Sequence, residues 1–131
     1  DFIDELFMNT LLIFIGAGLG GVSRYGISNA IYAILGRHFP YGTLLVNVSG
    51  CFLMGLMAAL VVERLHDLEP QLRSFMLIGF LGGYTTFSSF SIETIGLLEH
   101  GAWLNALLNI FFSITLCIGA TGLGLFVGRY L

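Results

Sequence analysis

The last apolar stretch of the chain carries five polar or weakly polar side chains at a strict spacing of four residues. Residues four apart share one face of an α-helix, so the series would extend over about 24 Å of that face. All five side chains can donate hydrogen bonds, and none carries a charge. We interpret the series as the lining of a path for an anion; hydrogen bonding between neighbouring membrane helices is the alternative. The residues are Asn105, Asn109, Ser113, Cys117 and Thr121.

A shorter series with the same spacing opens the second apolar stretch and consists of Thr43, Asn47 and Cys51. Asn47 would lie about one turn inside the membrane. Neutral donors of this kind suit an anion, because a carrier of cations or protons normally contains a buried carboxylate. We therefore count Thr43 and Asn47 as candidates for the same path.

The most informative segment reads Gly79-Phe-Leu-Gly-Gly-Tyr-Thr-Thr-Phe-Ser-Ser-Phe-Ser91 and occupies the middle of the third apolar stretch. Its paired glycines and two threonines favour a break in the helix. Backbone groups freed by a break in hydrocarbon cost several kcal/mol unless protein, water or an ion satisfies them, and such breaks mark ion sites in transporters. If two inverted copies pair there, their carbonyl groups could cage a small cation such as sodium. The alternative is a glycine-rich packing kink.

Phe87 and Phe90 stand three residues apart beside this break, so their rings share one helix face. The edge of an aromatic ring is positive and can contact an anion without adding a full charge. The neighbouring hydroxyl of Ser88 belongs to the same candidate group. Aromatic filler in a membrane helix is the alternative.

Two ionisable side chains fall inside apolar stretches, where such groups are candidates for function. Arg24, in the first helix, either extends to the nearer interface or attracts anions at a vestibule. Glu93, in the third helix, either accepts hydrogen bonds from the Ser/Thr run or belongs to a proton or anion relay.

The composition requires membrane helices to position these side chains. Of 131 residues, 56% are hydrophobic and 10% are charged, and the mean hydropathy is +0.92. Soluble domains contain about 25% charged residues, so a soluble enzyme or binding module is disfavoured, and disorder is excluded. We predict one all-α membrane domain, without enzymatic activity, whose apolar runs are continuous rather than alternating as in a β-barrel. Its four transmembrane helices are predicted at about 6–35, 43–62, 72–98 and 102–130.

The arginines give almost no preference for either orientation in the membrane. Four crossings put Arg64, Arg73 and Arg129 on one side, and Arg37 with Arg24 on the other. This balance under the positive-inside rule predicts dual topology, in which inverted copies pair as an antiparallel homodimer. A single fixed orientation with a weak signal is the alternative.

Two other features have simple interpretations. The run Gly16–Gly21 fits the pattern G-x-G-x-x-G of dinucleotide sites, but no acid follows between Glu5 and Glu63. We expect no nucleotide, and interpret the run as close helix packing. The net charge of −3 argues against nucleic acid. The acidic N-terminus and long apolar run lead us to expect no cleavable signal peptide.

Three blocks resemble the Fluc/CrcB fluoride channels: Gly20–Tyr25, Gly42–Asn47 and, most specifically, Gly79–Ser91. The resemblance covers the whole chain. It implies an antiparallel dual-topology homodimer with two fluoride pores and a central structural sodium ion. It also implies passive fluoride export across the cytoplasmic (inner) membrane of a microbe.

The resemblance assigns roles to individual residues. Gly82 and Thr85 correspond to the backbone ligands of sodium, and Asn47 to a pore asparagine. Phe87 and Phe90 correspond to the aromatic pair beside the fluoride path. Arg24 matches a vestibule arginine, and Glu93 matches a family glutamate. The family's polar track corresponds to Asn109, Ser113, Cys117 and Thr121, with departures at Asn109 and Cys117, where one subgroup has tyrosine and serine.

Two other classes of protein fit a small four-helix chain. A proton-coupled drug exporter would also use dual topology, but it needs a membrane-embedded carboxylate in the first helix, which has none after Glu5. A non-transporting assembly protein would tolerate changes at Asn47, Phe87 and Phe90.

Overall fold

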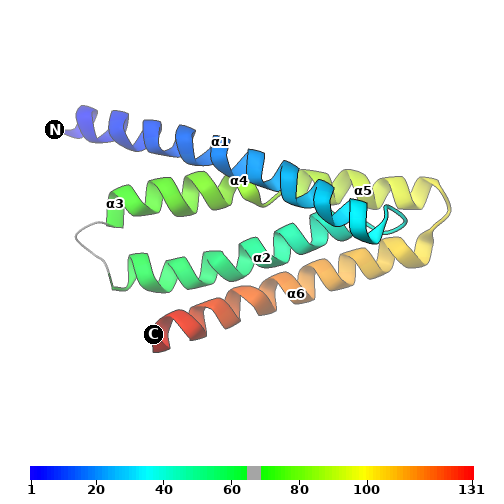
Figure 1. The fold of residues 1–131 in the computed structure, drawn as a ribbon. Helices are drawn as coiled ribbons and strands as arrows, with labels where there is room; N and C mark the ends of the chain where they lie inside the picture. The colour runs from blue at the N-terminus through cyan, green and yellow to red at the C-terminus, as the bar shows by residue number, and fades with distance from the viewer. Residues whose placement is uncertain (65–68) are drawn as a thin grey trace.

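The computed structural model describes residues 1–64 and 69–131, and all secondary structure in these ranges is helical (Figure 1). Four helical spans are long and apolar enough to cross a membrane, at Phe2–Leu35, Tyr41–Val62, Pro70–Glu99 and Trp103–Tyr130. The predicted all-helical membrane fold is thereby confirmed. Residues 65–68, between the second and third predicted helices, lie outside the described residues.

The spans are divided into shorter elements. Spans one and four are single helices, and span three contains the most subdivisions. The elements are α1 (Phe2–Leu35), α2 (Tyr41–Met57), η1 (Ala58–Val62), α3 (Glu69–Leu72), η3 (Arg73–Leu81), α4 (Gly82–Tyr84), α5 (Phe87–Glu99) and α6 (Trp103–Tyr130). Elements η1 and η3 are π-helical, a winding that often accompanies functional sites.

Both ends of α1 have local causes. It begins at Phe2, earlier than predicted, because the Asp1 side chain accepts a hydrogen bond from the backbone nitrogen of Ile3 at 3.2 Å. It ends at Leu35, where Gly36 adopts a φ of 85° and donates its N–H to the Tyr32 carbonyl at 2.8 Å. A positive φ is easiest for glycine, so Gly36 ends the helix, and the predicted last residue of 35 is confirmed.

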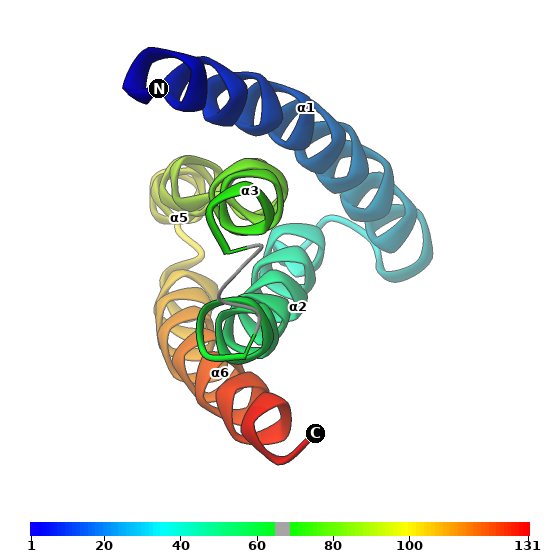
Figure 2. The same cartoon turned by 90° about the vertical axis from the view of Figure 1, so that its left-hand side faces the viewer.

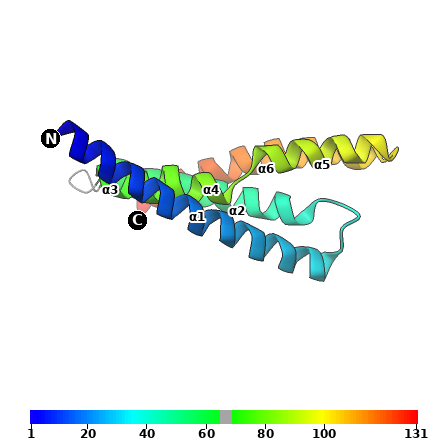
Figure 3. The ribbon, with the colours of Figure 1, turned by 90° about the horizontal axis from the view of Figure 1, so that it is seen from above.

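The helices form two closely packed pairs. Helix α1 packs on η3 and α4, whereas α2 packs on α6. Viewed end-on, α1 and α6 lie on opposite sides, with α2 and the third span between them (Figure 2). Helix α5 also packs on α6, and it covers part of α6 when the molecule is seen from above (Figure 3). The N- and C-termini lie at the same end, as four crossings require (Figures 1 and 3).

Glycines make both pairs possible. A Cβ atom on Gly16 or Gly20 of α1 would collide with backbone atoms of Phe75 or Phe80 in η3. This confirms that the run 16–21 includes close helix-packing contacts. In the other pair, Gly55 of α2 lies against the backbone carbonyl of Thr121 in α6, and a Cβ atom there would also collide.

Candidate functional site

Two residues with extended backbones separate α4 from α5 in the third span. Thr85 has φ −82° and ψ 154°, and Thr86 has φ −149° and ψ 114°. The Thr86 hydroxyl then caps α5 by accepting a hydrogen bond from the backbone nitrogen of Ser89 at 3.1 Å. The polar residues of this segment therefore start a new helix rather than continue the old one.

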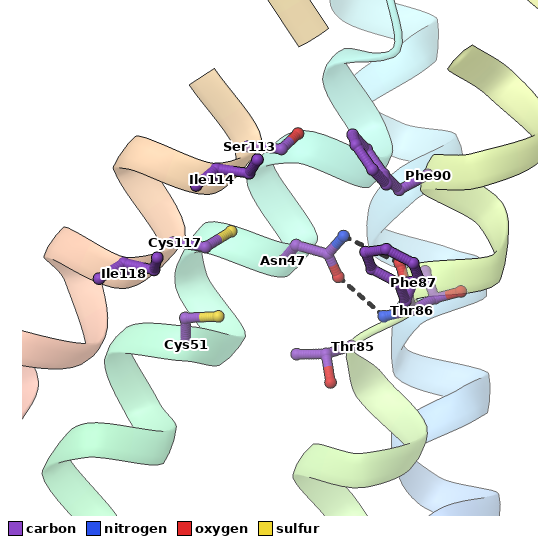
Figure 4. Close-up of a pocket in the computed structure, with 10 residues that line it drawn as sticks. All are labelled: Asn47, Cys51, Thr85, Thr86, Phe87, Phe90, Ser113, Ile114, Cys117 and Ile118. Carbon is purple, nitrogen blue, oxygen red and sulfur yellow. Dashed lines mark hydrogen bonds between the residues drawn. The ribbon is translucent and has the colours of Figure 1, made fainter. Parts of the chain in front are cut away.

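The side chain of Asn47 satisfies the backbone at this point. Its Nδ2 donates to the Thr86 carbonyl at 3.0 Å, and its Oδ1 accepts from the Thr86 backbone nitrogen at 2.8 Å (Figure 4). Asn47 is only 9% exposed. One buried amide thus pairs with both polar backbone groups of one residue on another span.

The carbonyl groups of Gly82 and Gly83, just before the extended residues, do not have the hydrogen-bond donors of a continuous helix. In a continuous α-helix the Gly82 carbonyl would accept from the Thr86 N–H, but that N–H donates to Asn47. The Gly83 carbonyl accepts instead from Arg24 Nε at 3.2 Å. Arg24 is therefore directed at the end of α4, whereas we had left open an extension to the interface. Gly82 is exposed.

A cavity of about 300 Å³ lies between α2, α5 and α6 beside the extended residues (Figure 4). Its wall combines an amide, hydroxyls, thiols, aromatic rings and aliphatic groups, without a charged side chain. The lining residues are Asn47, Cys51, Thr85, Thr86, Phe87, Phe90, Ser113, Ile114, Cys117 and Ile118.

The two phenylalanines of the predicted pair are in contact. The ring centroids of Phe87 and Phe90 lie 5.4 Å apart with an angle of 45° between the planes. Both rings line the cavity, and Phe87 is 78% exposed. Phe87 also borders a second, more open groove with Ser88, Ser91, Ile92 and Ile95. Ser88 is exposed, and its Oγ lies 3.3 Å from Thr86 Oγ1.

The predicted polar series on α6 is divided among four environments. Ser113 and Cys117 line the cavity. Asn109, only 2% exposed, donates from Nδ2 to the hydroxyl of Thr94 at 2.9 Å and accepts from Ser113 Oγ at 3.4 Å. The Thr121 hydroxyl donates to the Cys117 carbonyl at 3.0 Å. Asn105, the fifth member, makes a 3.5 Å contact with the His38 carbonyl.

Glu93 belongs to a cluster separate from the serines of its own helix. Its Oε1 accepts from Thr43 Oγ1 at 2.6 Å, and its Oε2 accepts from the Tyr32 hydroxyl at 2.9 Å. The same Tyr32 hydroxyl lies 3.4 Å from Thr43 Oγ1. Side chains of α1 and α2 therefore hold the carboxylate. It bonds these two hydroxyls rather than those of the predicted Ser/Thr run.

Sequence reasoning missed Tyr32 and Thr94. Tyr32 lies in the last turn of α1 and Thr43 in the first turn of α2. The short connection between the two helices provides a signal, because it brings both hydroxyls to one end of a helical hairpin. Thr94 follows Phe90 by one turn, and its hydroxyl donates to the Phe90 carbonyl at 2.7 Å. Its hydrogen bond with Asn109 joins α5 to α6. The sequence of neither helix alone predicts this bond.

A bundle of four membrane-capable helices, one of them interrupted beside an uncharged donor-lined cavity, defines a polytopic membrane protein of the channel and transporter type. The chain belongs to the CrcB family, described as "CrcB-like protein, Camphor Resistance", whose pattern matches residues 11–125.

The sequences of several named relatives match nearly the full length of the chain. A protein from Coxiella burnetii (strain Dugway 5J108-111) named fluoride-specific ion channel FluC is 54% identical over 124 residues, covering 95% of this chain and 100% of the relative. A protein of the same name from Magnetococcus marinus is 49% identical over 122 residues, covering 93% of this chain and 98% of the relative. One from Aeromonas salmonicida is 43% identical, covering 88% of this chain and 91% of the relative.

Proposed function

We propose that this protein is a fluoride-specific channel that lets fluoride leave the cytoplasm passively. The observation that carries the proposal is the uncharged cavity between α2, α5 and α6, in a chain of the CrcB family that matches a relative named fluoride-specific ion channel over 95% of its own length. Membrane potential supplies the driving force, because an inside-negative potential expels an anion. Hydrofluoric acid enters acidified cells as a neutral molecule and ionises inside, so a passive leak suffices for export.

The chemistry of the cavity fits a small, strongly hydrated anion. A pore must replace the water of fluoride with donors, yet bind weakly enough for the ion to leave. Asn47 uses one N–H on Thr86, and its NH₂ group has a second one. The edges of Phe87 and Phe90 add weak positive contacts without a fixed charge. Ser113, whose hydroxyl donates to Asn109, forms part of the wall. We assign the remaining candidate positions, Thr43, Ser88, Glu93, Asn109, Cys117, Thr121 and Arg24, to the approaches and walls of this path.

An antiparallel homodimer would complete the site. Gly82, Phe87 and Ser88 are exposed near the extended residues. In a single chain this polar backbone would meet lipid at the bilayer centre, where each unsatisfied group costs several kcal/mol. A second, inverted copy would cover it, and the near balance of arginines permits both orientations. Such a dimer would have two fluoride pores.

A structural sodium ion fits the same place. The Gly82 carbonyl lacks its helical donor because the Thr86 N–H is used by Asn47, and Thr85 is extended. Backbone oxygens at the end of a half-helix are suitable ligands for sodium. We propose that Gly82 and Thr85 of both copies hold it. When bound, it would supply positive potential and join the two copies.

We place this function in the cytoplasmic (inner) membrane of a microbe, where the membrane potential is inside-negative. Fluoride efflux from liposomes that contain only the purified protein tests the proposal. An electrode should record rapid fluoride release driven by a potassium-diffusion potential, with chloride release much slower. Release that requires a proton gradient would instead indicate the exporter class, and no release from well-folded protein would indicate an assembly protein.

A further inference from the structure

The two cysteines of the sequence line the same cavity, although they lie on different spans. Cys51 follows Asn47 by one turn of α2, and Cys117 follows Ser113 by one turn of α6. Both are half-buried free thiols. Figure 4 shows both sulfur atoms directed into the cavity. The proposed fluoride path includes Cys117 in its wall, but it does not require a second thiol on the facing helix.

Backbone contact explains why the two thiols lie at the same level of the cavity wall. Helices α2 and α6 run in the same direction, and Gly55 lies against the Thr121 carbonyl (Figure 1). Cys51 and Cys117 each precede that contact by four residues, which is one helical turn on both helices. The pair therefore lies directly above a fixed point of closest approach between the two spans.

We propose that Cys51 and Cys117 form a site for a soft metal ion that accepts two sulfur ligands in a line, and that Hg²⁺ is the clearest such ligand. Thiolate sulfur selects soft metals, and each thiol must lose its proton to bind. Both S–H bonds break, the two protons pass to the buffer, and two S–Hg bonds form. One divalent cation thus replaces two protons, so the net charge of the cavity is unchanged and no uncompensated charge is buried.

The surroundings exclude metals that need more ligands. Structural zinc takes four nitrogen or sulfur ligands. Within residues 1–64 and 69–131, no group of three or more His, Cys, Asp and Glu side chains could hold a metal ion. The other lining groups near the thiols are an amide, hydroxyls, rings and the aliphatic Ile114 and Ile118. This wall therefore suits a metal ion that needs only two thiolate ligands.

The functional consequence rests on the proposed fluoride path, whereas the binding site does not. A mercury ion between α2 and α6 would occupy the part of the cavity next to Asn47 and Ser113. We expect it to obstruct fluoride.

X-ray absorption on purified full-length protein loaded with mercuric nitrate in chloride-free buffer tests the site directly. Wild type should bind one mercury per chain with two sulfur neighbours. Cys51→Ser and Cys117→Ser should each show one sulfur neighbour, and the double variant should bind none after desalting. A single sulfur neighbour in the wild type, which needs no variant to measure, would overturn the site. Equal mercury binding by the double variant would also overturn it.

Fluoride efflux from liposomes tests the obstruction. Mercuric nitrate should abolish most of the wild-type flux, and a small dithiol should restore it. The double variant, compared with its own flux before mercury, should lose none. Undiminished wild-type flux with both sulfurs bound to mercury would overturn the obstruction. Absence of flux from untreated wild type would contradict the fluoride proposal instead, and the absorption spectra would still decide the metal site.

Discussion

Asn47 and Thr86 form a closed pair in which one side-chain amide bonds both polar backbone groups of a residue 39 positions away, at 3.0 and 2.8 Å. For the Thr86 N–H, the amide replaces the backbone carbonyl that a continuous helix would have supplied. The same residue lines the cavity. Asn47 therefore stabilises the fold and also lines the proposed fluoride path. A single substitution there should change both the stability of the protein and the fluoride flux.

Replacing Asn47 with alanine should lower thermal stability as well as fluoride flux. It leaves the half-buried N–H and carbonyl of Thr86 without this partner, at a cost of about 1 kcal/mol for each lost hydrogen bond. Thermal unfolding in detergent measures the first effect and liposome efflux the second. Asn29→Ala is a matched control, because Asn29 bonds the side chain of Arg37 at 3.3 Å near the end of α1. An unchanged melting temperature for Asn47→Ala would contradict the pairing.

Phe90→Ile should reduce fluoride flux by roughly fivefold while the protein stays folded. Isoleucine fills much of the space but has no positive ring edge, and an aromatic contact of this kind contributes about 1 kcal/mol. Phe111→Ile is the control, because Phe111 is exposed on α6 and packs edge-on against Phe112. Equal flux from Phe90→Ile and wild type would count against a role for the ring.

The carboxylate of Glu93 should couple Tyr32 to Thr43 in a double-mutant cycle. Tyr32→Phe and Thr43→Val each remove one hydrogen bond to this carboxylate, and each should cost about 1.5–3 kcal/mol of stability. Because both hydroxyls serve one acceptor, the double variant should depart from the sum of the single effects by at least about 0.5 kcal/mol.

Chemical or thermal unfolding of the four proteins measures that coupling. Tyr25→Phe is the control, because Tyr25 is exposed on the same helix. Strict additivity would mean that the two hydroxyls act independently of each other.

Gly20→Ala should reduce the yield of folded protein far more than Gly18→Ala. A Cβ atom at Gly20 would meet the backbone of Phe80 and Tyr84, whereas a Cβ atom at Gly18 would meet nothing within 4 Å. Both changes raise helix propensity equally, so the difference isolates helix packing. Size-exclusion chromatography of the two variants in parallel gives the measurement. Comparable profiles would show that α1 can move away from η3 without loss.

The sequence was sufficient for features that depend on neighbours along the chain. The four apolar spans follow from run length, the end of α1 follows from Gly36, and the contact of Phe87 with Phe90 follows from a spacing of three. Each is a property of one helix and its periodicity. The polar segment around Thr86 was singled out for the same reason.

Contacts between spans needed the structure. The partner of Arg24 is the Gly83 carbonyl, and Glu93 faces Tyr32 and Thr43, because helix rotation and crossing determine which groups meet. Periodicity alone did not reveal that the Asn109 side chain donates a hydrogen bond to Thr94 of a neighbouring helix. Helices α5 and α6 must pack before that pair exists.

The order of residues along the chain gives the extended pair Thr85–Thr86 a consequence for synthesis. Arg24 and Asn47, which bond the Gly83 carbonyl and the Thr86 backbone, both precede it in the sequence. A ribosome working from the N-terminus delivers both partners before Thr86 emerges. The extended backbone at Thr85–Thr86 is costly to place in hydrocarbon. It can thus enter the membrane beside helices that already carry its hydrogen-bond partners. Moving α1 and α2 to the C-terminus by circular permutation would remove that advantage without changing one contact of the finished fold.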